Sequence, residues 1–492
     1  MDIDKDYYAM LGVSIPATQD EIQRAYHRLA RRYHPDSREI DTPTALFHQV
    51  QEAYAVLSDA QSRRAYDRQR EERGLSDEVA LTWDVILSRE QLPAAHEEQV
   101  LYALVEIEPA ATSQRDRLPL NLCLVIDRST SMKGARLGHV KEAARQIADK
   151  LHRDDALAIV AFHDRAEVVL PSQVDVNSAK ARAKITALRA MGGTEILQGM
   201  RSGLDELDKH HGEGVISHLI LLTDGRTYGD DEECIAEAER AGERDIGISA
   251  MGIGEDWNDV LLDAIASRSG GTSAYIASPT QVRTLLRNKV RSLGAVFATG
   301  LSLEARTADG VRVESVFMTA PHLKSLTLQG GMTKLGALEA EAPMKILLEI
   351  GVEKQSLGQR RLAQLELTAD VPLLGRRGEI LRQDIYCTFM DEKTDPGEDE
   401  VPPGVLNALR KVTLYRMQEQ AWAALDEGKV DQATRQLEMV ATRLFDLGQD
   451  RLAQAAMLEA GRVARQGTPT AKGRKQIRYG TRSLHIEGEA YD

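Results

Sequence analysis

The spacing of apolar residues changes several times along the chain. Residues 1–75 contain two stretches in which apolar side chains recur every three or four positions, the spacing of a helix that buries one face. The first stripe comprises Ile22, Ala25, Leu29 and Tyr33, and the second comprises Phe47, Val50, Tyr54 and Leu57. Pro35 disfavours helical geometry at His34. The pattern therefore predicts an all-α helical hairpin with His34-Pro35-Asp36 in its loop.

The middle of the chain alternates apolar strands with helices. Within residues 116–297 there are five runs that are almost wholly apolar: LCLVI, LAIVAF, HLILLT, IGISAMGI and TSAYI. Such runs are typical of a parallel sheet that is covered on both faces. Residues 78–115 and 298–392 instead show the period-two alternation of half-buried strands. The simplest arrangement is a doubly wound α/β domain inserted into a β-sandwich, and Asp309-Gly310 predicts a hairpin turn within the second part of that sandwich.

The C-terminal part returns to helical spacing. The acidic stretch DEKTDPGEDEVPPG predicts a linker, and residues 400–466 predict a helical hairpin region with Gly428 and Gly448 as stops. Residues 467–492 are predicted to form a basic tail, which carries Lys472, Arg474, Lys475, Arg478 and Arg482. A basic tail can contact nucleic acid, but a solvated tail or one that docks on its own protein is the favoured interpretation.

Composition narrows the class of protein. The chain has 492 residues, of which 42% are hydrophobic and 28% are charged, and its formal net charge is −14. These values suit a soluble multidomain protein and argue against nucleic-acid binding, because a general nucleic-acid binder needs a basic surface. No apolar run approaches the roughly 20 residues that span a bilayer, and MDIDKDYYAM lacks a secretory h-region. Three widely spaced cysteines predict neither disulfides nor zinc, so we expect a cytoplasmic protein.

The stretch DRSTSMKG predicts a cluster of oxygen ligands. Asp127 ends the first strand of the α/β domain, Ser129 and Ser131 follow it, and Asp224 ends the later strand HLILLT. Thr194 lies between them in the loop GGTEI. Ligands of open α/β sheets bind beyond the carboxyl ends of the strands, and carboxylates with hydroxyls suit Mg²⁺ or Mn²⁺. A helix cap with a turn is the alternative, but the joint context of all five residues favours a metal site.

These five residues resemble the metal-ion-dependent adhesion site of the von Willebrand factor type A (VWA) domain. The resemblance covers about residues 116–297 and includes all five positions: Asp127, Ser129, Ser131, Thr194 and Asp224. It implies a doubly wound, Rossmann-like sheet and a metal whose last coordination position is filled by a carboxylate of a partner protein. It implies binding and not catalysis, so we expect that the protein is not an enzyme.

The N-terminal hairpin resembles the J-domain of DnaJ-type co-chaperones in the segments AYHRLARRYHPD and FHQVQEAYAVLSDAQSRRAYD. The resemblance implies docking on a DnaK-type chaperone and stimulation of its ATP hydrolysis. The residues that it assigns to docking are His34, Pro35 and Asp36, supported by Tyr26, Arg28, Arg31 and Arg32. His27 stands where the family usually has lysine, and no zinc-binding cysteines follow, which resembles the class of J-proteins with specialised client domains.

The leading hypothesis is a J-domain co-chaperone that recruits a partner or client through its metal-dependent adhesion site. The rival hypothesis is a VWA adaptor that works with a MoxR-type AAA⁺ ATPase in complex assembly or metal insertion. A metal-dependent hydrolase is a third hypothesis, but it needs a general base near the metal, and the sequence names none convincingly. The sequence carries no signature of the partner's identity.

Overall fold

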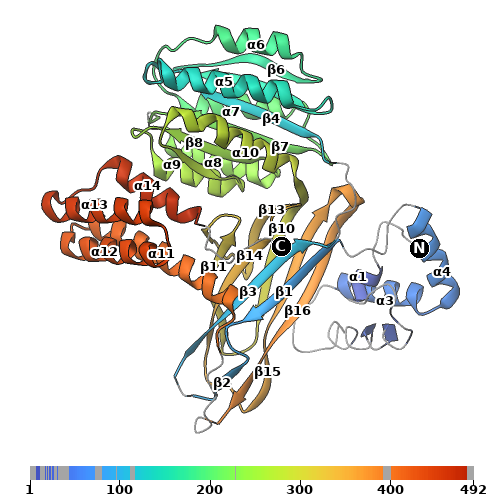
Figure 1. The fold of residues 1–492 in the computed structure, drawn as a ribbon. Helices are drawn as coiled ribbons and strands as arrows, with labels where there is room; N and C mark the ends of the chain where they lie inside the picture. The colour runs from blue at the N-terminus through green and yellow to red at the C-terminus, as the bar shows by residue number, and fades with distance from the viewer. Residues whose placement is uncertain are drawn as a thin grey trace.

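The computed structural model contains helical regions at both ends of the chain, a β-sandwich and an α/β domain (Figure 1). The structure describes residues 7–11, 17, 19, 22, 23, 25, 26, 30, 44–72, 80–95, 97–110, 117–227, 229–391 and 400–484. This multidomain architecture confirms the predicted fold class.

The N-terminal helical domain includes α1 (Tyr7–Leu11), α3 (Thr44–Leu57) and α4 (Ala60–Glu72). Its core contains four residues of the two predicted apolar stripes, namely Ile22, Ala25, Val50 and Leu57. Two tyrosines outside the predicted hairpin join this core, because the rings of Tyr7 and Tyr66 lie 4.9 Å apart. The hairpin is therefore completed by α1 before it and α4 after it, and the apolar pattern of the two stripes did not reveal either.

The β-sandwich consists, within the described residues, of two five-stranded sheets. One sheet has the order β1-β3-β14-β11-β12, with β1 (Leu81–Leu87), β3 (Gln99–Pro109), β14 (Met344–Val352), β11 (Val311–Ala320) and β12 (Lys324–Leu326). The other has the order β13-β10-β15-β16-β2, with β13 (Met332–Glu339), β10 (Val296–Thr307), β15 (Gly358–Val371), β16 (Arg376–Met390) and β2 (Gln91–Pro93). Each sheet takes strands from both sides of the α/β domain, as the sequence predicts.

The hairpin predicted at Asp309-Gly310 is wrong. The chain does turn there, and Gly310 has a φ of 71°. The two flanking strands, however, enter opposite sheets: β10 pairs with β13 and β15, whereas β11 pairs with β12 and β14. The Asp-Gly sequence predicts that the chain changes direction, but it does not determine whether the two flanking strands pair with each other. Because both strands bury their apolar faces in the same interior, the chain crosses from one layer to the other.

The α/β domain has a six-stranded sheet with the order β6-β5-β4-β7-β8-β9. Its strands are β4 (Leu120–Asp127), β5 (Ala156–Phe162), β6 (Ala166–Val174), β7 (Ile216–Thr223), β8 (Gly247–Ile253) and β9 (Ser273–Ile276). The pairs β4–β5, β4–β7, β7–β8 and β8–β9 are parallel, and β6 is antiparallel to β5. The five predicted apolar runs form the parallel strands.

Helices cover both faces of this sheet. Along β4, Leu122 and Leu124 face α5 (Ala135–Lys150), α6 (Ser178–Ala187) and α10 (Val282–Gly294). The alternate residues Cys123 and Val125 face α7 (Ile196–Leu207), α8 (Asp231–Glu243) and α9 (Asp259–Ser269). A strand that is buried on both sides must be apolar at every position, which explains the continuous runs in the sequence.

The C-terminal region contains α11 (Pro403–Asp426), α12 (Val430–Asp446), α13 (Asp450–Gln466) and α14 (Ala471–Arg482). Two differences from the sequence prediction are plain. Residues 400–466 form three helices rather than one hairpin, and the predicted tail begins with α14. Alanines such as Ala433, Ala441, Ala456 and Ala460 are buried between the helices, where small side chains allow close packing.

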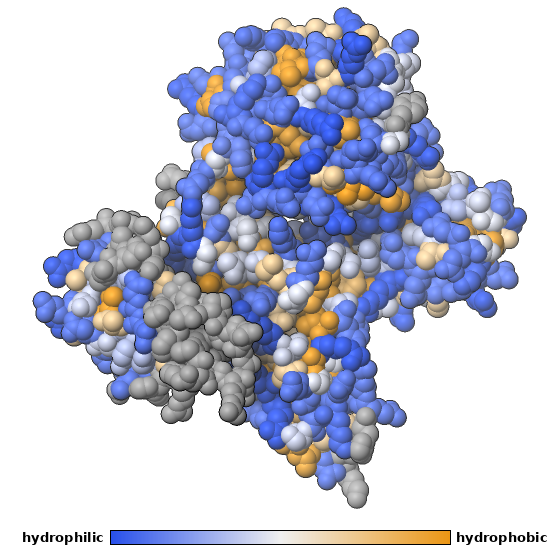
Figure 2. Space-filling view, turned by 180° about the vertical axis from the view of Figure 1, so that it is seen from behind, coloured by the Kyte–Doolittle hydropathy of each residue, from blue (hydrophilic) through white to orange (hydrophobic). Residues whose placement is uncertain are grey.

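The surface shown in Figure 2 is mostly hydrophilic, with apolar patches interspersed among the charged residues. Scattered apolar side chains of this kind are normal for a folded protein. Among the helices of the described residues, none combines the length and the apolar composition needed to cross a bilayer.

Candidate metal centre

Two aspartates meet at the carboxyl edge of the six-stranded sheet. Asp127 ends β4, and Asp224 follows β7, the strand that pairs with β4. Strand order reverses here, because the chain first places β5 on one side of β4 and later places β7 on the other. Ligands of open α/β sheets bind at such a reversal, beyond the ends of the strands. Both aspartates are buried there.

Asp127 is held by two hydrogen bonds. The backbone N–H of Ser129 donates to its Oδ1 at 2.7 Å, and the hydroxyl of Thr223 donates to its Oδ2 at 2.6 Å. Burial raises the pKa of Asp127 to about 6; the hydrogen bonds from Thr223 and Ser129 oppose this shift, and the nearby Asp224 adds slightly to it. A buried carboxylate next to a second carboxylate is stabilised by a cation.

The serine hydroxyls face Asp224. Ser131 Oγ donates to Asp224 Oδ1 at 2.7 Å and lies 2.9 Å from Ser129 Oγ. Neither serine caps α5, whose N-cap is Gly134, and the Ser129 side chain forms no capping hydrogen bond to the 3₁₀ turn that it precedes. The alternative of simple helix capping is therefore wrong for these hydroxyls.

Thr194 reaches the same edge of the sheet from the loop before α7. That loop is tied to the Asp127 loop by the N–H of Met191, which donates to the Arg128 carbonyl at 2.7 Å. Thr194 is buried beside Gly225, where an added Cβ would lie only 2.8 Å from Thr194 Oγ1. Glycine at 225 therefore leaves room for Thr194 to approach Asp224. The structure brings all five predicted residues to one place.

The donor set fits Mg²⁺ or Mn²⁺. It offers two carboxylates and three hydroxyls, which are hard oxygen ligands. Among the described residues, including those of this cluster, no group of three or more His, Cys, Asp or Glu side chains is placed to share a metal. The cluster therefore suits an ion that retains water molecules and an open position.

Two residues at this site were not predicted from the sequence. Thr223 holds Asp127, and it directly precedes Asp224, so its place at the strand end was a usable signal. Arg136 forms an ion pair with Asp224 Oδ2. Arg136 is the second residue of α5, where the helix dipole disfavours positive charge. A basic residue in the first turn of a helix was therefore a usable signal for an acidic partner.

Most of the predicted chaperone-docking residues lie outside the described residues: Arg28, Arg31, Arg32, His34, Pro35 and Asp36. Tyr26 is described and is half-buried. Its ring stacks on that of Tyr54, with the centroids 3.9 Å apart. Tyr26 thus joins its helix to α3, and its docking role stays a prediction.

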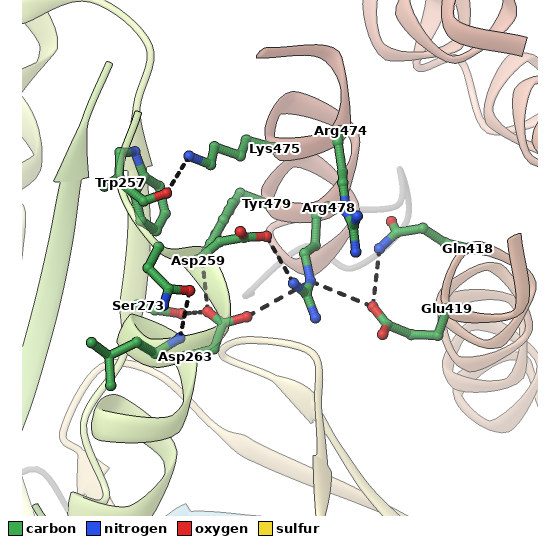
Figure 3. Close-up of polar contacts among 12 residues, drawn as sticks. Trp257, Asp259, Asp263, Ser273, Gln418, Glu419, Arg474, Lys475, Arg478 and Tyr479 are labelled. Atoms are coloured by element: carbon green, nitrogen blue, oxygen red, sulfur yellow. Dashed lines mark hydrogen bonds and ion pairs between the residues drawn. The ribbon is translucent and has the colours of Figure 1, made fainter. Parts of the chain in front are cut away.

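Helix α14 docks on the α/β domain through the basic residues of the predicted tail (Figure 3). Lys475 donates to the carbonyls of Glu255 and Trp257 at 2.6 and 2.7 Å, and its ammonium lies 4.2 Å from the centroid of the Trp257 ring. Arg478 donates to Asp259 at 2.9 Å. These contacts confirm the self-docking interpretation of the basic segment.

Asp263 of α9 collects several donors from this interface. It accepts hydrogen bonds from Tyr479 at 2.6 Å and from Ser273 at 2.5 Å, and Arg482 lies 2.9 Å away. The docking residues recur at three- and four-residue intervals along α14, so they share one face of the helix. Tyr479 also packs in the apolar core that lies between the sheet and α9.

Family models match three parts of the chain. The DnaJ domain matches residues 6–67, and the von Willebrand factor type A domain matches residues 121–288. The chain joins a J-domain to a VWA domain. A third model, described as the Sll0103-like C-terminal alpha-helical domain, matches residues 403–486 and so covers α11 to α14.

Relatives match different parts of the J-domain–VWA chain. The uncharacterized protein sll0103 of Synechocystis is 29% identical over 365 residues, which are 73% of this chain and 86% of that protein. The chaperone protein DnaJ 2 of Thermus thermophilus is 59% identical over 63 residues, and DnaJ of Bacillus cytotoxicus is 53% identical over 64 residues. Each of these matches spans 13% of this chain, and only 22% and 18% of the respective DnaJ proteins.

Solved structures share the fold around the VWA domain. The von Willebrand factor type A protein from Catenulispora acidiphila has a TM-score of 0.66 at 20% identity, and it covers 82% of this chain and 97% of its own. The ArnB paralog VWA2 from Sulfolobus acidocaldarius has a TM-score of 0.50 at 14% identity, with 82% and 100% covered. The likeness extends well beyond the residues of the VWA model.

Proposed function

We propose that this protein is a co-chaperone whose J-domain stimulates ATP hydrolysis by a DnaK-type chaperone, while its VWA domain holds a partner or client at a metal-dependent site. The observation that carries the proposal is the presence in one chain of a DnaJ domain and of a VWA domain with a buried carboxylate–hydroxyl cluster at its sheet edge. The J-domain would recruit the chaperone, and the VWA domain would select what is delivered to it.

The proposed partner site needs residues for binding and none for catalysis. Asp127, Ser129, Ser131, Thr194 and Asp224 would hold Mg²⁺ or Mn²⁺. A bound divalent ion supplies a positive centre with an open position for one carboxylate oxygen of a partner protein. The hydroxyls of Ser129 and Ser131 lie close enough to each other, at 2.9 Å, to bind one ion together. Both aspartates are buried, so they would keep bulk water away from their side of a bound ion.

The chaperone half is tested with the DnaK-type chaperone of the same host. The full chain is expected to accelerate its ATP hydrolysis, and His34→Gln is expected to abolish the acceleration. His139→Gln, the same substitution placed in α5 of the VWA domain, is the matched control and is expected to stimulate like the wild type. No stimulation by the wild type would disprove the chaperone half and favour the adaptor for a MoxR-type AAA⁺ ATPase. Equal stimulation by the wild type and His34→Gln would remove His34 as a docking residue.

The metal half is tested by calorimetric titration of Mg²⁺ and Mn²⁺ into the full chain. Asp127→Ala is expected to remove binding while far-ultraviolet circular dichroism stays unchanged, because strand packing stabilises the domain. Asp154→Ala, which removes an exposed carboxylate before β5, is the control and is expected to bind like the wild type. Identical titrations of the wild type and Asp127→Ala would show that the cluster is not a metal site.

A further inference from the structure

Arg136 occupies one side of the candidate metal cluster. Its Nη1 forms an ion pair with Asp224 Oδ2 and lies 3.5 Å from the carbonyl oxygen of Ser131. The Asp224 side chain has no exposed area, whereas the Arg136 side chain is 32% exposed. The guanidinium therefore reaches inward from the surface and contacts a carboxylate that solvent does not reach.

The helix that carries Arg136 does not favour a cation at this position. Arg136 lies in the first turn of α5, which contains no acidic residue, and the unpaired N–H groups of a helix start repel positive charge. The N-cap, Gly134, has no side chain to offset this. The attraction that keeps the guanidinium there must come from the metal cluster, in which two buried aspartates are adjacent.

A glycine beside Arg136 leaves room for its guanidinium. Gly254 follows β8 with a φ of 79°, and a Cβ at this glycine would lie 3.1 Å from Arg136 Nη2. A larger residue there would press on the guanidinium. The guanidinium is thus packed against Gly254 as well as paired with Asp224.

Both oxygens of Asp224 are engaged in this arrangement. Ser131 donates to Oδ1 and Arg136 to Oδ2. Among the residues that the structure describes, Arg136 is the one basic side chain in an ion pair with either Asp127 or Asp224. One fixed positive charge therefore faces two buried acidic groups, where a divalent ion would bring two charges.

We infer that Arg136 is a tethered cation that neutralises Asp224 in the metal-free protein and competes with the divalent ion for it. This inference rests on the proposed metal site. Arg136 sets how much free Mg²⁺ or Mn²⁺ is needed to load the site. Before loading, it reduces the destabilisation of the fold by two neighbouring buried carboxylates. It acts through Asp224 and is a positioning residue.

The first test compares Mn²⁺ affinity in Arg136→Gln and Lys133→Gln, by electron paramagnetic resonance of free Mn²⁺ and by calorimetry. Lys133 is exposed and lies two residues after Ser131, so its substitution removes the same charge near the site without an ion pair to either aspartate. Arg136→Gln is expected to bind Mn²⁺ about tenfold more tightly than Lys133→Gln. A tenfold change in affinity corresponds to the free energy of one charge-assisted hydrogen bond, here the bond from Arg136 to Asp224 that Mn²⁺ no longer has to displace. Equal affinities, or weaker binding by Arg136→Gln, would overturn the inference.

The second test measures thermal unfolding of the same full-length proteins in chelator and in Mg²⁺. Without metal, Arg136→Gln is expected to unfold at a lower temperature than Lys133→Gln, because two buried carboxylates then lack their cation. Mg²⁺ is expected to raise the unfolding temperature more in Arg136→Gln than in the wild type. The same rise in both proteins would count against competition.

The results separate this inference from the proposed metal site. If the wild type binds Mn²⁺ and Arg136→Gln gains nothing over Lys133→Gln, the tethered cation is wrong and the metal site stands. If neither the wild type nor Arg136→Gln binds Mn²⁺, the metal site itself is wrong, and the inference falls with it. If Arg136→Gln does not fold in chelator, Arg136→Lys keeps a charge with poorer reach; it is then expected to bind Mn²⁺ more tightly than the wild type, and unchanged binding would overturn competition.

Discussion

Lys475→Met is expected to loosen the contact between α14 and the VWA domain. Lys475 is 4% exposed, and its ammonium donates to the carbonyls of Glu255 and Trp257 at 2.6 and 2.7 Å. Methionine retains most of the apolar stem and removes the charge. The substitution therefore isolates what the ammonium contributes to docking.

The expected magnitude follows from three effects. The buried Trp257 carbonyl loses its donor at a cost of about 1–3 kcal/mol. The Glu255 carbonyl is only partly buried, so water can replace its donor and the cost there is smaller. Loss of the contact between the ammonium and the Trp257 ring costs about 1–2 kcal/mol. Relief from burying the ammonium acts in the opposite direction, since burial lowers the pKa of Lys475 and burying a charge costs several kcal/mol. We expect a net loss of about 2 kcal/mol, which corresponds to an opening equilibrium that is about 30-fold more populated.

Hydrogen–deuterium exchange measures this opening directly. Peptides that cover residues 254–262 and 471–482 are expected to exchange about 30-fold faster in Lys475→Met. Lys472→Met is the matched control, because Lys472 lies on the same helix and is exposed. Exchange in Lys475→Met that equals exchange in Lys472→Met would refute the reasoning and leave Arg478, Tyr479 and Arg482 as the main attachment.

Two further predictions concern the sandwich and the VWA sheet. A fragment of residues 116–297 is expected to fold alone, whereas residues 300–392 are not, because β14 pairs with β3, which that fragment lacks; a well-dispersed amide spectrum from residues 300–392 would contradict this. Burial, together with the charge of Lys289, holds the pKa of His218 well below its usual range. The unfolded chain then binds a proton below about pH 6.5 that the folded chain does not, so stability falls with falling pH there. The unfolding temperature of the wild type is expected to drop more between pH 7.5 and 5.5 than that of His218→Gln, and parallel curves would remove His218 as the cause.

The sequence predicts those parts of the fold that depend on local periodicity. The five apolar runs became the parallel strands because both faces of these strands are covered. Strand β6 was not predicted: it is an antiparallel edge strand in which only two of nine residues are buried, so it carries no long apolar run. The Asp309-Gly310 turn misled for a related reason, since which sheet a strand joins is decided by distant partners such as β14 and β15.

The same division holds at the sites. The spacing of Asp127, Ser129 and Ser131 on one turn is local, and the general rule for sheet edges adds Asp224 and Thr194. The ion pair of Arg136 with Asp224 joins residues 88 positions apart, and only the fold brings them together. The basic stripe of α14 was visible as charge, but its acceptors on α9, Asp259 and Asp263, lie more than 200 residues earlier in the chain.

The place where α14 docks has a consequence for any partner held at the metal. Lys475 binds the loop that follows β8, and β8, β7 and β4 are parallel neighbours, so this loop lies at the same carboxyl edge as Asp127 and Asp224. Strands are spaced about 5 Å apart, which puts the end of β8 about 10 Å from the end of β4. Arg226, two residues after Asp224, donates to the Asp256 carbonyl of that loop at 3.0 Å. A protein interface of about 800 Å² per partner has a radius of roughly 16 Å. A folded partner centred on the proposed metal site would therefore extend over the β8–α9 loop and approach α14, so the C-terminal helical domain would border the surface on which that partner rests.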